Sequence, residues 1–269
     1  MIYEWLLQGN ERFGTSPHDI CLNVLNCKPN QINERVVIAP WWKPDFFMDF
    51  GAKIDIVFDG EHKKIWNIHM KEFDLTYIRT GIGAPVVGDI TLALGCTPCK
   101  KAIFIGSAGA LDIEFCIGDI VIPTYSVCGD GMCRYLTKGK LKDNDMFGQI
   151  VYPNEGLIKK INSLADKICT ENSVNWHIGK NYSVDTIFAQ FSHIDEIVGL
   201  GCNTIEMETA TFFKAAEIAN IDAGAVFSIS DNTMNKKSLY SGRTNEEMQY
   251  RHEVRAKIIP QIILEALNE

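Results

Sequence analysis

The sequence predicts an α/β fold in which helices cover both faces of a mixed, largely parallel β-sheet. Short apolar runs rich in β-branched residues alternate with helical patterns along the 269 residues, and this alternation is typical of such sheets. No linker, low-complexity tract, repeat or charge block divides the chain. We therefore expect one domain over residues 1–269, in which residues 1–34 form an N-terminal arm before the first strand.

The strands are predicted from apolar, β-branched runs, and the helices from apolar residues that recur with a helical period. In chain order the elements are strands at 35–40 (RVVIAP), 53–58 (KIDIVF) and 75–81 (LTYIRTG), a helix at 86–95 (VVGDITLALG), strands at 101–106 (KAIFIG) and 119–123 (DIVIP), helices at 154–169 (NEGLIKKINSLADKIC) and 206–220 (EMETATFFKAAEIAN), a strand at 222–230 (DAGAVFSIS) and a helix at 246–267 (EEMQYRHEVRAKIIPQIILEAL).

The composition excludes several classes of function. The net charge of −8 argues against nucleic acid or a membrane surface as a partner, because phosphate surfaces attract basic faces. No apolar stretch reaches the roughly 20 residues of a membrane span, and the start MIYEWLLQGNERFG does not resemble a signal peptide. Nine scattered cysteines suit a reduced, cytoplasmic protein, and the pair Cys96 and Cys99 lacks the second pair that a metal site requires. We expect no metal.

Candidate site residues follow the predicted strands. Ligands of such folds bind at the carboxyl ends of strands, where four polar or glycine-rich segments occur. They are TGIGAP (80–85), GSAGA (106–110), Glu206–Glu208 and SISDNT (228–233). Glycines there let backbone N–H groups approach an anion or a sugar, although a glycine-rich turn also forms for steric reasons alone.

Glu208 lies on the apolar side of its predicted helix. The residues at helical spacing from it are those of a core-facing stripe, namely Phe212, Ala215, Ala216 and Ala219. A buried carboxylate costs several kcal/mol unless it is hydrogen-bonded. Glu208 therefore either caps the first turn of the helix or binds a ligand.

These segments resemble, in the same order, those of the nucleoside phosphorylase and uridine phosphorylase superfamily, which also includes purine nucleosidases. The similar pieces are SPHDI (16–20), RVVIAP, TGIGAPVV (80–87), IFIGSAGALDIEFCIGDIVIP (103–123), SVDTIF (183–188), IEMETA (205–210) and VFSISDN (226–232). The resemblance implies a three-layer α/β/α sandwich around a twisted mixed sheet. It also implies a homo-oligomer, either a dimer or a hexamer built as a trimer of dimers.

The resemblance assigns the sugar-binding residues. It implies that Glu208 accepts hydrogen bonds from the ribose hydroxyls and that Met207 packs against the sugar. A fixed negative charge there favours the oxocarbenium-like state that glycosidic cleavage passes through. Glu206 is either a second contact or a charge in the first helical turn. His18 matches a histidine that reaches the ribose 5′-hydroxyl of a neighbouring subunit.

The resemblance also assigns the residues around the base. A lone aspartate after a strand is often a turn residue or a helix cap, and Asp231 fits that description too. In the purine-directed branch, however, the matching aspartate is protonated and donates to N7 of the leaving base. Asp231 therefore favours a purine, with Arg243 as the nearest counterpart of the arginine that supports this acid. The remaining base contacts are expected from Ile187, Phe188, Gln190, Ala108 and Gly109.

The acceptor site departs from the resemblance. The family carries one phosphate arginine after its first strand and another before the central glycine, whereas this chain has PWWKPDFF (40–47) and Phe104 there. Ser107 and the backbone at Gly106 are retained as phosphate contacts. A dianion in a dehydrated site requires fixed cations, so two outcomes are open: either Lys43 and Arg79 replace the missing arginines, or phosphate saturates the site only at unusually high concentration.

The expected activity is phosphorolysis of a nucleoside, which gives the free base and a pentose 1-phosphate. Inorganic phosphate is then a co-substrate, and no organic cofactor is implied. Two alternatives stay open. One is a nucleosidase that uses water, for which PWWKPDFF supplies only Asp45 as an acid. The other is a catalytically weak nucleoside-binding protein that has lost the acceptor site.

Overall fold

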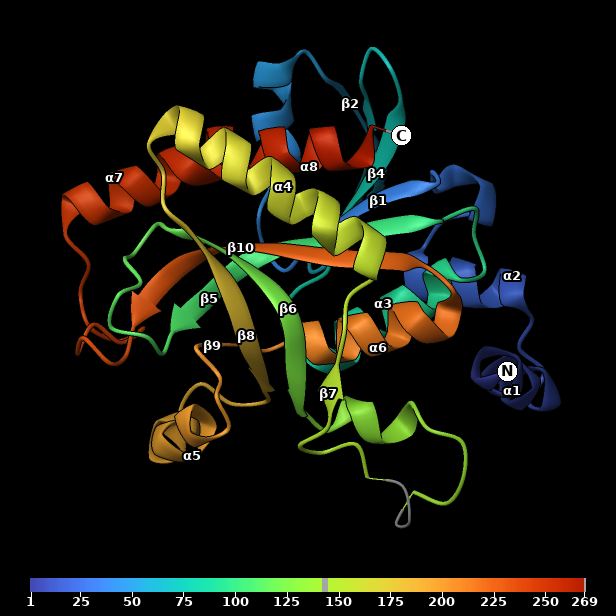
Figure 1. The fold of residues 1–269 in the computed structure, drawn as a ribbon. Coiled ribbons are helices and arrows are strands. Elements are labelled where there is room, and N and C mark those ends of the chain that lie inside the picture. The colour runs from blue at the N-terminus through green and yellow to red at the C-terminus, as the bar shows by residue number, and fades with distance from the viewer. Residues whose placement is uncertain (142–144, 269) are drawn as a thin grey trace.

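The computed structural model describes residues 1–141 and 145–268, and within these ranges ten strands form one sheet (Figure 1). Helices α4 (Glu155–Asn172) and α8 (Ile259–Leu267) lie on one face of this sheet. Helices α3 (Ala84–Leu94) and α6 (Thr209–Ala219) lie on the other. The predicted α/β fold, with a mixed sheet between two layers of helices, is confirmed.

All six apolar runs predicted as strands form strands. In full, the strands are β1 (Arg35–Ala39), β2 (Lys53–Asp59), β3 (Lys64–His69), β4 (Asp74–Arg79), β5 (Lys101–Ala110), β6 (Ile120–Gly129), β7 (Ile150–Val151), β8 (Trp176–Val184), β9 (Thr204–Glu206) and β10 (Asp222–Asn232). The prediction missed β3, β7, β8 and β9. Strand β8 has no apolar run because Asn181 and Ser183, both fully buried, bond polar partners in the interior.

Two predicted helices have different limits. Helix α6 begins at Thr209 rather than at 206, because residues 204–206 form β9. The segment predicted as one helix over 246–267 consists of α7 (Asn245–Glu253), a π-helical turn at Val254–Ile258 and α8. Pro260 lies in the first turn of α8 and has no N–H to donate, so a continuous α-helix cannot pass through it.

The remaining helical segments are short or lie at the N-terminus. They are α1 (Ile2–Arg12), α2 (Pro17–Ile20), a π-helix at Cys21–Leu25, α5 (Ile194–Gly199) and 3₁₀ turns at Pro29–Gln31, Pro44–Phe50, Met132–Tyr135 and Ala189–Ser192. None of the helices in the described ranges is both long and apolar enough to cross a membrane.

The sheet closes on itself at one end. Its order is β10-β6-β8-β9-β5-β1-β4-β3-β2, with β7 paired to β6 off this path, and β10 also pairs with β5. The β5–β10 pairing is parallel and runs from Lys101 to Ala110 on β5. Strands β5, β9, β8, β6 and β10 therefore form a ring, which brings strands that are distant in sequence together around one end of β5.

The predicted N-terminal arm has two parts. Residues of α1 are not buried, although Tyr3 donates from its hydroxyl to the Leu92 carbonyl at 2.8 Å. Cys21, Leu25 and Ile32, in contrast, are buried and belong to the hydrophobic core that α3 and α6 share with the sheet. The second half of residues 1–34 is therefore part of the core.

We predict that Gly88→Val destabilises the protein by about 2–3 kcal/mol, because overpacking a tight contact forces neighbouring atoms apart. Gly88 lies in α3, where a Cβ atom would stand 2.8 Å from Cγ2 of Thr211 on α6. Urea unfolding measures the change. Gly9→Val, in α1 with no atom near its Cβ position, is the matched control. Equal losses for the two variants would show that the α3–α6 contact tolerates side chains.

Candidate active site

A cavity of about 250 Å³ opens at the carboxyl half of β5. On one edge of β5, β1 is paired as far as Phe104, and β9 begins only at Gly109. Ser107 lies between these two pairings and lines the cavity. The cavity therefore lies where β5 changes its neighbour, as is usual for ligand sites in α/β sheets.

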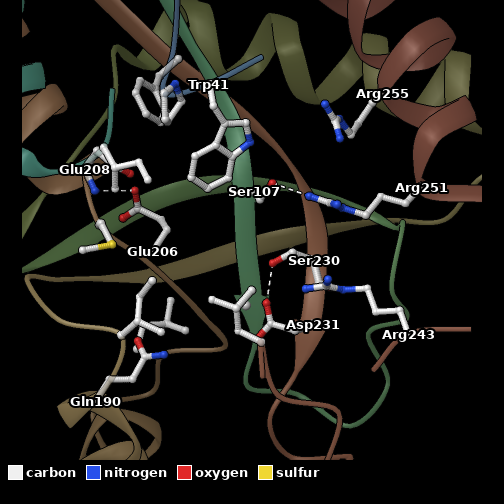
Figure 2. A pocket seen from close by; sticks show the side chains of 18 residues that line it. Trp41, Ser107, Gln190, Glu206, Glu208, Ser230, Asp231, Arg243, Arg251 and Arg255 are labelled. Atoms are coloured by element: carbon white, nitrogen blue, oxygen red, sulfur yellow. Dashed lines mark hydrogen bonds between the residues drawn. The ribbon is translucent and has the colours of Figure 1, made fainter. Parts of the chain in front are cut away.

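Opposite charges line opposite sides of this cavity. Figure 2 shows the carboxylates of Glu206 and Glu208 on one side and the side chains of Arg251 and Arg255 on the other. Ser107 and Asp231 lie between these groups in the same view, and Arg243 reaches in beside Asp231. The four strand ends that the sequence singled out do meet in the structure, and each contributes at least one lining residue.

Glu206 is held by hydrogen bonds on both of its oxygens. Oε1 accepts from Nδ2 of Asn181 and from Oγ of Ser183, each at 2.6 Å. Oε2 accepts from the backbone N–H groups of Glu208 and Thr209 at 2.7 and 2.8 Å. Burial raises the pKa of Glu206, and these hydrogen bonds oppose that rise. Glu206 therefore lines the cavity, but its carboxylate accepts hydrogen bonds from the first turn of α6. This agrees with the second of its two predicted roles, a charge in the first helical turn.

Glu208 does not cap its helix. Although it stands at the N-cap position of α6, its side chain makes no capping bond and accepts from the backbone N–H of Gly83 at 2.6 Å. The helix-cap explanation is therefore wrong. Only 5% of Glu208 is exposed, and its pKa is raised to about 8, first by burial and then by the charge of Glu206. The core-facing residues expected from its spacing are all buried, namely Phe212, Ala215, Ala216 and Ala219.

Asp231 lies inside β10, so it is neither a turn residue nor a helix cap. Its Oδ1 accepts from Oγ of Ser230 at 2.5 Å, and Gly109 faces it across the β5–β10 pairing. Burial raises the pKa of Asp231, while the Ser230 hydrogen bond and the positive charges of Arg243 and Arg251 lower it in part. A buried carboxyl group with a raised pKa can hold a proton and donate it.

Three arginines form the cationic side of the cavity. Arg243 donates from Nε to the carbonyl of Ser230, next to Asp231. Arg251 donates from Nη2 to Oγ of Ser107 at 2.6 Å. The guanidinium of Arg255 lies 4.2 Å from the ring centroid of Trp42.

Arg251 and Arg255 were not among the residues predicted from the sequence. Their spacing of four residues was the available signal, because it places both side chains on one side of a helix. That signal is weak, since arginines at this spacing are common on solvated helical faces.

The predicted replacements for the phosphate arginines are not at the cavity. Lys43 is exposed, and Arg79 donates from Nη2 to the carbonyl of Glu61 at 3.2 Å. Arg79 is the last residue of β4, and β1 separates β4 from β5 in the sheet. Within this chain, the expectation that Lys43 and Arg79 complete the acceptor site is therefore wrong.

Two further predicted residues of β5 lie outside the cavity. Ser107 and Gly109 line it, whereas Gly106 and Ala108 do not. A Cβ atom on Gly106 would stand 3.4 Å from the ring of Phe227, and Ala108 is buried. Gly106 and Ala108 therefore do not line the cavity, in contrast to the prediction.

The predicted base contacts separate into two groups. Ile187 and Gln190 line the cavity together with Ile205 and Met207, which makes this part largely apolar. Phe188 does not line it, and 83% of Phe188 is exposed. His18 is exposed on α2 and does not line the cavity of its own chain.

Aromatic side chains occupy the two regions where the resemblance places cations. Phe104 is fully buried, with its ring centroid 5.5 Å from that of Phe212 and 5.8 Å from that of Phe227. In the segment after β1, Trp41 lines the cavity and Trp42 is buried. In the described part of the chain, no group of three or more His, Cys, Asp or Glu side chains is arranged to hold a metal ion.

Comparison with known proteins identifies related sequences. The family described as "Phosphorylase superfamily" matches residues 49–268. A guanosine phosphorylase from Halorubrum lacusprofundi is 24% identical over 191 residues, which cover 70% of this chain and 73% of that protein. A DeoD-type purine nucleoside phosphorylase from Streptococcus pneumoniae is 25% identical over 161 residues. That match covers 58% of this chain and 62% of the relative, which is less than two thirds of its length.

Solved structures share the fold. A uridine phosphorylase from Vibrio fischeri ES114 superposes with a TM-score of 0.67 at 19% identity, over 94% of this chain and 95% of that chain. An AMP nucleosidase from Bacteroides thetaiotaomicron VPI-5482 superposes with a TM-score of 0.65 at 16% identity, over 99% of this chain and 96% of that chain. At these identities the similarity establishes the fold alone.

We predict that Glu208→Gln raises the melting temperature more at pH 8 than at pH 5. The pKa of Glu208 is about 8 when folded and 4.5 as its ordinary value, so between these values only the folded chain keeps the proton. The wild type therefore loses stability as pH rises through this window, and the neutral glutamine does not. Thermal unfolding across pH measures the difference. Glu114→Gln, at an exposed position, is the control, and an equal pH profile for all three proteins would contradict the raised pKa.

Proposed function

The chain belongs to the phosphorylase superfamily, a family of nucleoside phosphorylases and nucleosidases, and we propose that it cleaves a purine nucleoside by phosphorolysis. One observation carries this proposal. Glu208 and Asp231, two buried carboxyl groups with raised pKa values, line one cavity together with Ser107. A pair of this kind provides a charge for the sugar and a proton for the leaving base.

Glu208 is the sugar-binding group in this proposal. One of its oxygens is fixed by the N–H of Gly83, so the carboxylate has a defined orientation. Sugar hydroxyls that donate to it favour the ionised form, and substrate binding therefore lowers its pKa below the value in the empty cavity. As the glycosidic bond breaks, the sugar becomes cationic, and the ionised carboxylate stabilises that charge.

Asp231 is the general acid. The departing base takes the electron pair of the glycosidic bond, and the proton of Asp231 neutralises it at N7. The short bond from Ser230 fixes Oδ1, and Arg243 holds the Ser230 carbonyl in place. Similarity to a guanosine phosphorylase and to purine nucleoside phosphorylases supports a purine as the base.

The acceptor is inorganic phosphate. A phosphate oxygen forms a bond to C1′ while the bond from C1′ to the base breaks, which gives the free base and a pentose 1-phosphate. The cationic side of the cavity beside Ser107 supports an anionic acceptor rather than a neutral one. The reaction requires no metal and no organic cofactor.

Hydrolysis is the second candidate. It is favoured by the shared fold with an AMP nucleosidase and by the absence of Lys43 and Arg79 from the cavity. Water would then attack C1′ and give the free sugar. The difference between the two reactions lies entirely in the acceptor.

We predict that purine nucleosides are cleaved in phosphate buffer with formation of a pentose 1-phosphate, and that cleavage nearly stops when phosphate is removed. Chromatographic analysis of the products from a panel of purine and pyrimidine nucleosides tests this. Free sugar at the same rate with and without phosphate would establish hydrolysis instead. Saturable binding of a nucleoside without products under either condition would identify a binding protein.

We predict that Asp231→Asn lowers the rate of purine nucleoside cleavage by about 10²-fold or more, because it removes the proton donor and preserves the shape. The protonated acid is the active form, so the wild-type rate falls as pH rises through the raised pKa of Asp231, and the variant loses this dependence. Initial rates across pH measure both effects. Asp49→Asn, at an exposed position, is the control, and a wild-type rate in folded Asp231→Asn would refute the assignment.

A further inference from the structure

Arg251 and Arg255 form no ion pair with a carboxylate among the residues that the structure describes. The ion pairs within residues 1–141 and 145–268 include neither of them. Their Nε atoms are buried and have no hydrogen-bond partner among the described residues. Burial first, and then the like charges of Arg255 and Arg243, lower the pKa of Arg251 to about 10, while the charge of Asp231 opposes this in part. Two guanidinium groups that share a cavity without an ion-pair partner are unfavourable until an anion binds.

Ser107 adds a donor to this cluster. Its Oγ already accepts a hydrogen bond from Arg251 at 2.6 Å, which occupies one lone pair and leaves the hydroxyl proton to donate. Ser107 lines the cavity at the stretch of β5 that neither β1 nor β9 covers. An anion placed there receives hydrogen bonds from the hydroxyl of Ser107 and from the N–H groups of Arg251.

The position of Arg255 is fixed by an aromatic contact. Its guanidinium lies over the ring of Trp42, which is 2% exposed and belongs to the segment after β1. Such stacking holds the plane of the guanidinium and leaves its edge N–H groups available for hydrogen bonds. The π-helical turn at Val254–Ile258 contains Arg255, so this arginine is presented from an irregular helical segment beside the cavity.

We propose that Arg251 and Arg255 bind the phosphoryl group of the substrate together with Ser107. The proposal rests on the proposed function, because that reaction brings a phosphate to this cavity. The C-terminal helical segment thus supplies the cations that Phe104 and the PWWKPDFF segment do not. Arg243 has a different role, because its Nε is engaged by the Ser230 carbonyl beside Asp231. The phosphoryl group belongs either to free phosphate or to the 5′-phosphate of a nucleotide.

The test uses Arg251→Gln, Arg255→Gln and the double variant of the full chain, with Arg12→Gln on exposed α1 as the control. The lysine variants at both positions keep the charge but not the fork of N–H groups. We expect the KM for inorganic phosphate to rise about tenfold or more in each glutamine variant, because each loses charge-assisted hydrogen bonds. The KM for the purine nucleoside stays within about twofold, and the lysine variants recover part of the loss.

A binding measurement separates this proposal from the proposed function. We expect inorganic phosphate to raise the melting temperature of the wild type and of Arg12→Gln, but not that of the double glutamine variant. Two results together would assign the site to the 5′-phosphate: cleavage of a nucleoside 5′-monophosphate without free phosphate, and a raised KM for that nucleotide in the variants. They would refute phosphorolysis and leave the arginine assignment standing. Unchanged phosphate KM and unchanged stabilisation in folded variants that still catalyse phosphorolysis would overturn the arginine assignment alone.

Discussion

The buried carboxylate of Glu206 determines where the other site residues lie. It joins β8, through Asn181 and Ser183, to the first turn of α6, through the N–H groups of Glu208 and Thr209. A carboxylate without these four donors would be very costly at this depth. With Glu206 engaged by the helix, the side chain of Glu208 is free to turn toward Gly83 and the cavity. Glu208, the predicted sugar-binding residue, is thus positioned by Glu206.

The cavity separates charge in a way that suits its proposed chemistry. Carboxylates line one side of the cavity and arginines the other. In the proposed reaction the carboxylates face the cationic sugar and the arginines face the anionic acceptor. Asp231 also lines the cavity. Burial raises its pKa, and the charges of Arg243 and Arg251 lower it in part. The arginines are charged and held in place before the substrate arrives, and preorganised charges of this kind stabilise a transition state more than the ground state.

The sequence predicted the features that are encoded locally. Apolar, β-branched runs identified six of the strands. The glycine-rich strand ends and the acidic segments identified residues that line one cavity. Strand β8 was missed because its interior residues are polar and become explicable only when Glu206 is known to face them. Which residues of β5 line the cavity could be predicted only with knowledge of how the strand is placed in the sheet.

Of the three arginines on the cationic side of the cavity, only Arg243 was predicted. Lys43 was chosen because it lies in the segment after β1, and Arg79 because it precedes TGIGAP. The segment after β1 instead provides Trp42 as a platform for Arg255. Tertiary packing therefore decides which arginines reach the cavity. Local pattern carries no information about which distant helix packs beside a given strand.

The hydrogen bond from Arg251 to Ser107 joins residues that are 144 positions apart in the sequence. The central strand can be synthesised and paired with β1 well before the residue that completes the cavity exists. Closing so long a loop costs chain entropy, and contacts of this kind form late in folding. The helix that carries Arg251 is anchored by α8, whose Ile259, Ile262 and Ile263 are fully buried. The proposed anion site is thus complete only when the chain end has docked, which ties it to completion of the fold.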